Sequence, residues 1–464
     1  MKTKSLLAAA ISVALLAGCN DDTTNVITPE PPVAATEVNI ASFNLSFDHS
    51  DFAELGSLMA LTPAEQDTLI AGWEDGSITD EAELKRAEKV IQIRNNATII
   101  QKTRPAVLLM KEFNNDGTGE DISVLRGFRL NYLGVPQTFE GEQLQPIQYP
   151  YAESYATNTG LAIDSDIDNN GTIGLPGDAH GFGNFHGQYA FALLSQFEID
   201  TANSRTFQKF LWKDMPGETN VPVNCAEGNT ADWCADETWY TQAEWDILRL
   251  SSKNHVDAVV KVPTADGETK SVHLLLSHPT PPIFDKGEEA PYNKMHNRAE
   301  IDFWVDYIDG ADYIYDDAGV TGGLANGEMF VVMGDLNADP LSGDGDLTAI
   351  NDLMTHDKVN QLATFGVYAP KSLGGPECVA IGDCRETDLK YPEMVTSVSG
   401  LRLDHVIPSA ELNVVDSGVF WPASFEDGSK LMKDARLTRI DTWNPGVGKN
   451  VSSDHRLVWI KAEL

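Results

Sequence analysis

The chain has 464 residues, of which 42% are hydrophobic and 22% are charged. That balance excludes a disordered chain, which has too few apolar residues to build a core. The 33 Lys and Arg residues against 70 Asp and Glu residues give a formal net charge of −37, which excludes a non-specific nucleic-acid coat protein, because such a protein neutralises phosphates with a surplus of basic residues.

The first residues of the chain are typical of an export signal. Two lysines precede a short apolar run, Leu6–Leu16, and the segment Leu-Ala-Gly-Cys then ends at Cys19. The run is too short for a membrane span, which needs about 20 apolar residues. The pattern resembles the lipobox of bacterial lipoproteins, which implies removal of a signal peptide (residues 1–18), acylation of the Cys19 thiol and a lipid-anchored place in the bacterial cell envelope. The polar, Pro-rich residues 19–36 then predict a semi-rigid tether.

Four cysteines remain for the folded part of an exported chain, where an oxidising compartment allows disulfides. Their close spacing predicts two local bridges, Cys225–Cys234 and Cys378–Cys384, out of three possible connectivities. A zinc site is the alternative, but no Cys-x-x-Cys segment occurs and no histidine is near either pair.

The chain from residue 37 to residue 464 predicts one α/β domain. Val38–Leu45 alternates like a strand, and residues 81–102 carry apolar positions at helical spacing up to Pro105, which ends the helix. The apolar run Ala106–Met110 has the length of a buried strand. Further strands are expected at residues 190–194, 271–278, 330–333, 406–407 and 457–460. Strands and helices mixed in this way predict sheets layered with helices.

Polar residues follow the ends of these predicted strands. They are Asn44, Glu112, His278, Asp335 with Asn337, Asp404, and Asp454 with His455. The most specific segment is Gly334-Asp335-Leu336-Asn337, where an extended backbone would present Asp335 and Asn337 on the same side.

The motifs SFN, KEF, SHP, GDLNADP, LDH and SDHRLV occur in this order from about residue 38 to residue 464. Together they resemble the endonuclease/exonuclease/phosphatase superfamily, which has the fold of pancreatic deoxyribonuclease. The resemblance implies a four-layer α/β sandwich of two packed mixed β-sheets flanked by helices, with large loop insertions in a single catalytic domain. It also implies hydrolysis of a phosphoric ester.

The resemblance implies a role for each strand-end residue. Asn44, Glu112 and Asp454 match metal ligands, and Asp335 and Asn337 match the pair that orients or deprotonates the attacking water. His455 matches an acid/base or phosphate-contacting histidine that Asp404 orients, and His278 matches a second histidine near the phosphate.

The chemistry of these side chains supports a metal site. Two carboxylates about 4 Å apart repel by roughly 4 kcal/mol at an effective dielectric constant near 20. A divalent cation removes that repulsion, and carboxylate and amide oxygens suit Mg²⁺ or Mn²⁺.

The roles of three further residues do not follow from the family pattern. Lys111 precedes Glu112, and strand alternation predicts that it points away from the site; the alternative is a cleft-facing lysine that binds phosphate. His405 is interpreted as structural. Arg298, which opens a predicted helix running to Ile308, is expected to form a surface ion pair with a nearby acid, with a phosphate-binding role as the alternative.

An acidic loop suggests a second, structural ion. Residues Asp164, Asp166, Asp168, Asn170 and Thr172 place oxygen atoms at alternate positions around Gly171, as in an EF-hand loop counted from Asp166. Position 12 of that loop is Gly177 rather than Glu, although Asp178 is adjacent. A structural Ca²⁺ is therefore expected, with a plain acidic loop as the alternative.

These observations favour an exported, monomeric, metal-dependent phosphoesterase that contacts the membrane only through its lipid anchor. The shortage of basic residues favours a small phosphodiester or phosphomonoester substrate over nucleic acid. An extracellular nuclease and a lipid phosphodiesterase are the next alternatives, and a non-catalytic surface module is the last.

Overall fold

The computed structural model describes residues 36–48, 50–386, 388–433 and 451–464. The predicted signal peptide, Cys19 and nearly all of the predicted tether lie outside the described residues. These described residues belong to one compact unit. Among the described residues, no helix combines the length and the apolar composition that crossing a membrane requires.

Two six-stranded sheets form the centre of the molecule. The first has the order β13-β14-β1-β2-β6-β5, and its central strands β1 and β2 run parallel while all its other pairs are antiparallel. Its strands are β1 (Glu37–Asn44), β2 (Val107–Lys111), β5 (Tyr151–Ser154), β6 (Phe191–Ser195), β13 (Asn413–Val419) and β14 (Val458–Glu463).

The second sheet repeats this plan, with one parallel pair flanked by antiparallel neighbours. Its order is β12-β11-β10-β9-β7, with β8 paired to β9, and β10 and β11 are its parallel strands. Its strands are β7 (Glu198–Ile199), β8 (Arg205–Thr206), β9 (His255–Pro263), β10 (Thr269–Ser277), β11 (Phe330–Asp335) and β12 (Asp404–Pro408). A separate hairpin consists of β3 (Thr138–Phe139) and β4 (Glu142–Gln143).

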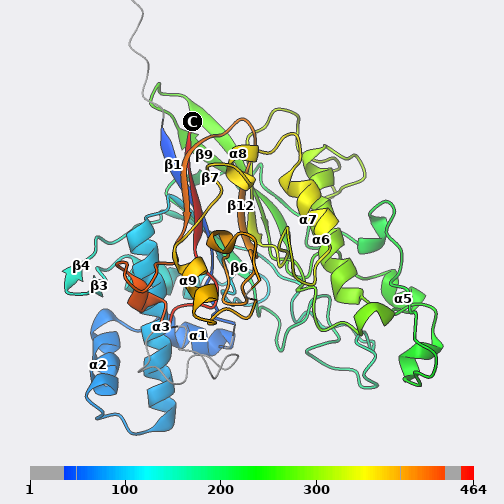
Figure 1. Cartoon of the computed structure of the whole chain (residues 1–464), viewed down its shortest axis with the longest axis horizontal. Coiled ribbons are helices and arrows are strands. Elements are labelled where there is room, and N and C mark those ends of the chain that lie inside the picture. Colours follow the sequence, from blue (N-terminus) through cyan, green and yellow to red (C-terminus); the bar gives the residue numbers. More distant parts are fainter. Residues whose placement is uncertain (1–35, 49, 387, 434–450) are drawn as a thin grey trace, which may run out of the picture. The chain divides into compact units, whose positions relative to one another are not determined.

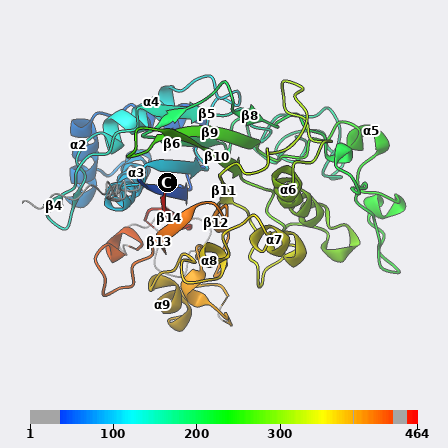
Figure 2. The same ribbon diagram turned by 90° about the horizontal axis from the view of Figure 1, so that it is seen from above.

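The two sheets pack face to face, and helices cover their outer faces. Strand β1 contacts β11 and β12 across the interface. Helix α3 (Glu81–Thr103) lies on one side of the sheets, whereas α6 (Tyr292–Ile308) and α7 (Leu347–Met354) lie on the other (Figure 1, Figure 2). Strands covered on both faces contain continuous apolar runs, and every residue of β2, β6, β11 and β12 is buried. The predicted four-layer α/β sandwich is therefore confirmed.

Local signals explain where the main helix begins. The Asp80 side chain caps α3 by accepting hydrogen bonds from the backbone N–H groups of Ala82 and Glu83. Val90, Ile93, Ala97 and Ile100 then bury one stripe of the helix in the core that it shares with the first sheet. The remaining helices are α1 (Phe52–Met59), α2 (Pro63–Glu74), α4 (Ser123–Phe128), α5 (Gln242–Trp245), α8 (Gln361–Thr364) and α9 (Gly374–Ala380).

The predicted strands and the predicted helix at residues 81–102 are present with shifts of a few residues. Strand β9 was not predicted, and α6 begins at Tyr292, before its expected start at Arg298. Both predicted disulfides are confirmed, with Cα–Cα distances of 5.8 Å for Cys225–Cys234 and 5.2 Å for Cys378–Cys384.

Candidate active site

The topology brings the ends of six chain segments to one edge of the sandwich. Parallel strands end at the same edge of a sheet, so β1 and β2 end together and β10 and β11 end together. Strands β14 and β12 are antiparallel to β1 and β11, and they therefore begin at that edge. This arrangement collects the predicted residues Asn44, Glu112, His278, Asp335, Asp404, Asp454 and His455.

A close approach of β10 and β11 keeps this edge narrow. A Cβ atom at Gly334 would lie only 2.2 Å from the Ser277 carbonyl oxygen, so the position requires glycine. Asp335 and His278, which follow these two residues, are thereby held side by side, with His278 Nε2 3.6 Å from Asp335 Oδ2.

The first group at this edge consists of Glu112, His278 and Asp335, whose possible ligand atoms all lie within 4.8 Å of one another. The Asn44 amide Nδ2 donates to Glu112 Oε1 (2.9 Å) and to Asp335 Oδ2 (3.1 Å). It therefore joins the two carboxylates across the sheet interface.

Electrostatics within this group favour a cation. Burial, together with the nearby carboxylates of Asp48 and Asp454, raises the pKa of Glu112 well above its ordinary value. Burial also raises the pKa of Asp335. The Nδ1 atom of His278 is buried without a hydrogen-bond partner. Two crowded carboxylates form an oxygen donor set that suits Mg²⁺ or Mn²⁺, and the Asn44 amide nitrogen holds them together by donating to both.

The second group is a histidine held by a carboxylate. His455 Nδ1 lies 2.7 Å from Asp404 Oδ2 and 3.6 Å from Asp335 Oδ2. Burial disfavours the imidazolium, but Asp404 and Asp335 outweigh it and raise the pKa of His455 well above its ordinary value. Burial likewise opposes ionisation of Asp404, but Lys111 and His455 hold the pKa of Asp404 below its ordinary value. The shared proton therefore resides on His455.

The prediction that Lys111 points away from the site is wrong. Its Nζ lies 2.5 Å from Asp404 Oδ1, and both side chains are fully buried. Alternation along an extended strand would have placed Lys111 and Glu112 on opposite faces, but Glu112 has a φ of 54° in the left-handed region. That backbone turn brings both side chains to the site, where Lys111 neutralises Asp404 instead of binding phosphate.

Asp454 lies beside the first group, but its carboxylate is not part of the set of described ligand atoms within 4.8 Å of one another. Its Oδ1 accepts a hydrogen bond from Ser46 Oγ at 2.5 Å, and Ser453 Oγ donates to the Asn44 carbonyl. These contacts attach the segment before β14 to the end of β1. A direct metal-ligand role for Asp454 remains a prediction.

Asn337 lies in the turn that follows β11. Its backbone N–H donates to Asp335 Oδ1 (3.1 Å), and its amide Nδ2 donates to the Pro279 carbonyl (3.0 Å). The Asn337 side chain thus connects the turn after β11 to the residue that follows His278.

The other two residues singled out from the sequence are structural. His405 is fully buried and lies 3.0 Å from the Ala338 carbonyl oxygen, and burial next to Arg402 lowers the pKa of His405 to about 3. Arg298 forms an ion pair with Glu218 and lies 3.9 Å from Asp302. The expected ion pair with a nearby acid is therefore present, although its partner is Glu218 and not Glu300, the acid adjacent in sequence.

The predicted calcium loop brings three carboxylates together, one of them from outside the predicted set of ligands. Oxygen atoms of Asp166, Asp168 and Asp178 lie within 4.8 Å of one another. Asp178 is buried and accepts hydrogen bonds from the backbone N–H groups of Ile167 (2.6 Å) and Gly174 (2.6 Å). Asp164 is not part of this group of carboxylates. Asp178, rather than the residue at the twelfth position of the loop, is the third carboxylate near Asp166 and Asp168, and the calcium ion itself stays a prediction.

Calcium is expected to raise the melting temperature of the protein, and Asp166→Ala is expected to reduce that increase, because the variant removes one carboxylate from the group. Differential scanning fluorimetry with Ca²⁺ and with a chelator measures the effect. Asp266→Ala, in the exposed turn between β9 and β10, is the matched control and should respond to Ca²⁺ like the wild type. An unchanged response in Asp166→Ala would remove the calcium prediction.

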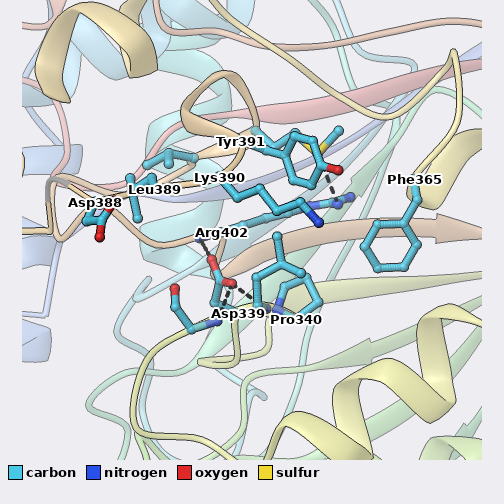
Figure 3. Close-up of a pocket in the computed structure, with 13 residues that line it drawn as sticks. Asp339, Pro340, Phe365, Asp388, Leu389, Lys390, Tyr391 and Arg402 are labelled. Carbon is cyan, nitrogen blue, oxygen red and sulfur yellow. Dashed lines mark hydrogen bonds between the residues drawn. The ribbon is translucent and has the colours of Figure 1, made fainter. Parts of the chain in front are cut away.

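A cavity of about 200 Å³ lies beside the loops that carry the site (Figure 3). Asp339, which follows Asn337, accepts hydrogen bonds from the backbone N–H groups of Leu341 (2.7 Å), Ser342 (3.0 Å) and Arg402 (2.7 Å). These bonds tie the loop after β11 to the segment before Asp404. The cavity lining includes none of the residues of the two groups described above.

Sequence analysis missed two residues at this edge. Lys253 and Ser46 approach the site from segments with no recognised motif. Lys253 comes two residues before β9, the strand that was not predicted. A prediction of β9 would have placed Lys253 at a strand end, as for the other residues of the site.

Comparison with protein-family models identifies one matching family. The model of the endonuclease/exonuclease/phosphatase family matches residues 41–455. A search of curated proteins finds no significant match.

Solved structures show distant similarity. A crystal structure of an endonuclease/exonuclease/phosphatase from Beutenbergia cavernae has 12% identity and a TM-score of 0.42, with 92% of this chain and 72% of that chain covered. Truncated TDP2 from Caenorhabditis elegans has 11% identity and a TM-score of 0.35, with coverage of 92% and 98%. Beta toxin from Staphylococcus aureus has 13% identity and a TM-score of 0.38, with coverage of 91% and 99%.

The family model spans nearly all of the described residues, from within β1 to His455. Members of the family generally hydrolyse phosphoester bonds. The chain belongs to the endonuclease/exonuclease/phosphatase family.

Proposed function

We propose that the chain is an exported, metal-dependent phosphoesterase that cleaves a phosphodiester or phosphomonoester by attack of water. The observation that carries this proposal is the meeting of Glu112, His278 and Asp335 with the buried Asp404–His455 pair at one edge of the sandwich.

Glu112 and Asp335 are the residues that would hold the metal, with Asn44 and His278 beside them. Mg²⁺ or Mn²⁺ bound there supplies polarisation of a phosphoryl oxygen. Asp335 is buried, Glu112 is half-buried, and the two carboxylates are crowded together, so their repulsion favours a bound cation over a vacant site.

The protein's own residues supply the proton chemistry. Asp335 and Asn337 are assigned to the attacking water, and Asp335, as the carboxylate of the two, would accept its proton. His455 keeps Nδ1 on Asp404, which leaves Nε2 to donate a hydrogen bond or a proton to the phosphate. Lys111 balances the charge of Asp404, so that Asp404 orients the imidazole without leaving a second unpaired anion in the site.

A small or medium-sized ester is the favoured substrate. A polynucleotide track needs exposed cations along its length, and the chain carries a net charge of −37. The richest basic stretch of the sequence begins with Lys430, which pairs with Glu140 (2.9 Å), and Lys433, which pairs with Asp383. The rest of that stretch, Arg436 and Arg439, lies outside the described residues.

We also propose export and lipid anchoring at Cys19. The N-terminal pattern and two disulfides favour an oxidising compartment outside the cytoplasm. Metabolic labelling with a fatty acid tests this directly, because labelling should disappear in a Cys19→Ala variant.

A substrate screen of the purified protein tests the activity. It combines Mg²⁺, Mn²⁺ and Ca²⁺ with a chromogenic phosphodiester, a chromogenic phosphomonoester, DNA and a choline phospholipid. We expect metal-stimulated hydrolysis of a small ester that exceeds turnover of DNA and of lipid. Preferential degradation of DNA would support the nuclease alternative, and preferential cleavage of phospholipid would support the lipid phosphodiesterase. No turnover of any substrate with any metal would favour a non-catalytic surface module.

A further inference from the structure

Lys253 is a buried cation with little to neutralise it. Only 5% of its surface is exposed, and its Nζ donates one long hydrogen bond, 3.4 Å to the Pro279 carbonyl oxygen. Among the described residues, no carboxylate lies within ion-pair distance of this Nζ. An ammonium group has three N–H donors, so a hydrogen-bonding partner is still needed for the others.

The two other buried lysines of the described chain are different. Lys111 lies 2.5 Å from Asp404, and Lys89, which is also 5% exposed, lies 2.6 Å from Glu54. A buried charge without a close counter-ion is costly, which is why buried lysines are normally paired. The position of Lys253 therefore indicates that its anion comes from outside the protein.

Lys253 approaches the site where the segment that follows β10 meets the turn that carries Asn337. The Pro279 carbonyl that accepts from Lys253 also accepts from Asn337 Nδ2 at 3.0 Å. Pro279 directly follows His278, which belongs to the Glu112 and Asp335 group. The Lys253 ammonium and the Asn337 side-chain amide thus donate to the same carbonyl oxygen, at the border of the site.

The segment that carries Lys253 is held firmly. Glu300 on α6 accepts hydrogen bonds from the backbone N–H groups of Ser252 (2.7 Å) and Thr280 (2.6 Å), and Ser252 Oγ donates to the His278 carbonyl. Glu300 therefore joins the segment before β9 to the segment after β10. This leaves the Lys253 side chain placed in advance of any ligand.

The surrounding charges support a cation at this place. Burial lowers the pKa of Lys253, whereas the negative charges of Glu300, Asp335 and Glu112 oppose that shift. The same positive charge, after burial itself, contributes to lowering the pKa of His278. The carboxylates of Glu300, Asp335 and Glu112 therefore favour the charged form of Lys253 at the border of the site.

We propose that Lys253 binds a non-bridging oxygen of the phosphoryl group and that its ammonium forms a phosphoryl-oxygen subsite on the His278 side of the cluster. This inference rests on the proposed function and extends it, because it assigns a residue to the anionic part of the substrate. The ligand class is a phosphate monoester or diester, and inorganic phosphate should compete for the same place.

The test replaces the ammonium by an apolar group of similar length. Lys253→Met is expected to lower kcat/KM for the chromogenic ester by about 100-fold, the loss typical of one preorganised donor to a developing anion. Inhibition by inorganic phosphate should weaken by at least about tenfold. The melting temperature should stay the same or rise, because the variant no longer buries a charge without a counter-ion.

Two further variants separate binding from structure. Lys253→Arg keeps a cation and is expected to retain phosphate inhibition. Lys89→Met, at a position with the same exposed fraction but away from the cluster, is the matched control and should retain wild-type kcat/KM. Should Lys253→Met fail to fold, the same comparison is made between Lys253→Gln and Lys253→Arg.

The outcomes distinguish the two proposals. Wild-type kcat/KM and wild-type phosphate inhibition in Lys253→Met would overturn the inference while leaving the phosphoesterase proposal intact. A lower melting temperature with unchanged phosphate binding would assign Lys253 a purely structural role and would also overturn it. If the wild type hydrolyses no ester, the proposed function fails, and calorimetry of inorganic phosphate with Mn²⁺ present still decides whether Lys253 binds phosphate.

Discussion

Replacement of Glu112 by Gln is expected to lower kcat by about 10³-fold and to abolish stimulation by Mg²⁺ or Mn²⁺. Gln keeps the size of the side chain and an oxygen that can accept from Asn44 Nδ2, which now lies 2.9 Å from Glu112 Oε1. The change removes only the negative charge that favours the metal. Steady-state kinetics over a range of metal concentrations measures the effect.

The same variant carries its own control for folding. Because burial and the neighbouring carboxylates disfavour the charged form of Glu112, Glu112→Gln in a chelator should melt at or above the temperature of the wild type. It should also lose the stabilisation that metal gives to the wild type. Glu153→Gln on edge strand β5 is the matched substitution in the same sheet and should keep full activity. Native-like activity with a native-like metal response would remove Glu112 from the site.

His455→Ala is expected to lower turnover by about 10³-fold while the fold is retained. The carboxylate that orients His455 stays paired, because Lys111 Nζ lies 2.5 Å from Asp404 Oδ1. The variant therefore does not leave an unpaired buried anion, which is the usual cause of unfolding after such a deletion. Kinetics on an authentic substrate and a melting curve measure the two effects.

A histidine outside the two groups, with a side chain about as exposed as that of His455, provides the comparison. His356→Ala, beside Asp309, should leave both kcat and the pH profile unchanged. Preserved turnover in His455→Ala would count against any acid/base role for this imidazole.

The pH profile follows from the same pair. Asp404 and Asp335 raise the pKa of His455, so the imidazolium persists above the pH at which an ordinary histidine loses its proton. Activity that needs this proton is therefore present at lower pH and falls as the pH rises through the raised pKa. Asp404→Asn lowers that pKa, so the falling limb of kcat against pH should move toward lower pH.

The local elements of the fold were predictable, but one central strand was not. Apolar runs of strand length marked β2, β6, β10 and β11 in the sequence, because both faces of these strands are covered. Strand β9 was not predicted because a polar residue, Asp257, interrupts its apolar pattern. Asp257 is buried and lies within hydrogen-bond distance of His273 (2.8 Å) and Tyr307 (2.6 Å), partners that only the folded chain provides.

The candidate site was predictable as a set of residue types, and its errors arise from the backbone. Glu112, His278, Asp335, Asp404 and His455 lie together because the strands that carry them share one edge. The orientation of Lys111 depends on the left-handed conformation of Glu112, which alternation rules cannot anticipate. Lys253 depends on a carbonyl far along the chain and has no local signal.

The pairing of β1 with β14 has a consequence for the order of events in folding. Strand β1 is synthesised early, but its antiparallel partner β14 is synthesised last, and Glu37 of β1 lies opposite Glu463 of β14. Asp454 and His455 come just before β14. Contacts so distant in sequence form slowly, because a long loop must close before they are gained. A chain still emerging from the ribosome therefore lacks Asp454 and His455, and the candidate site is complete only after β14 has been added between β13 and β1.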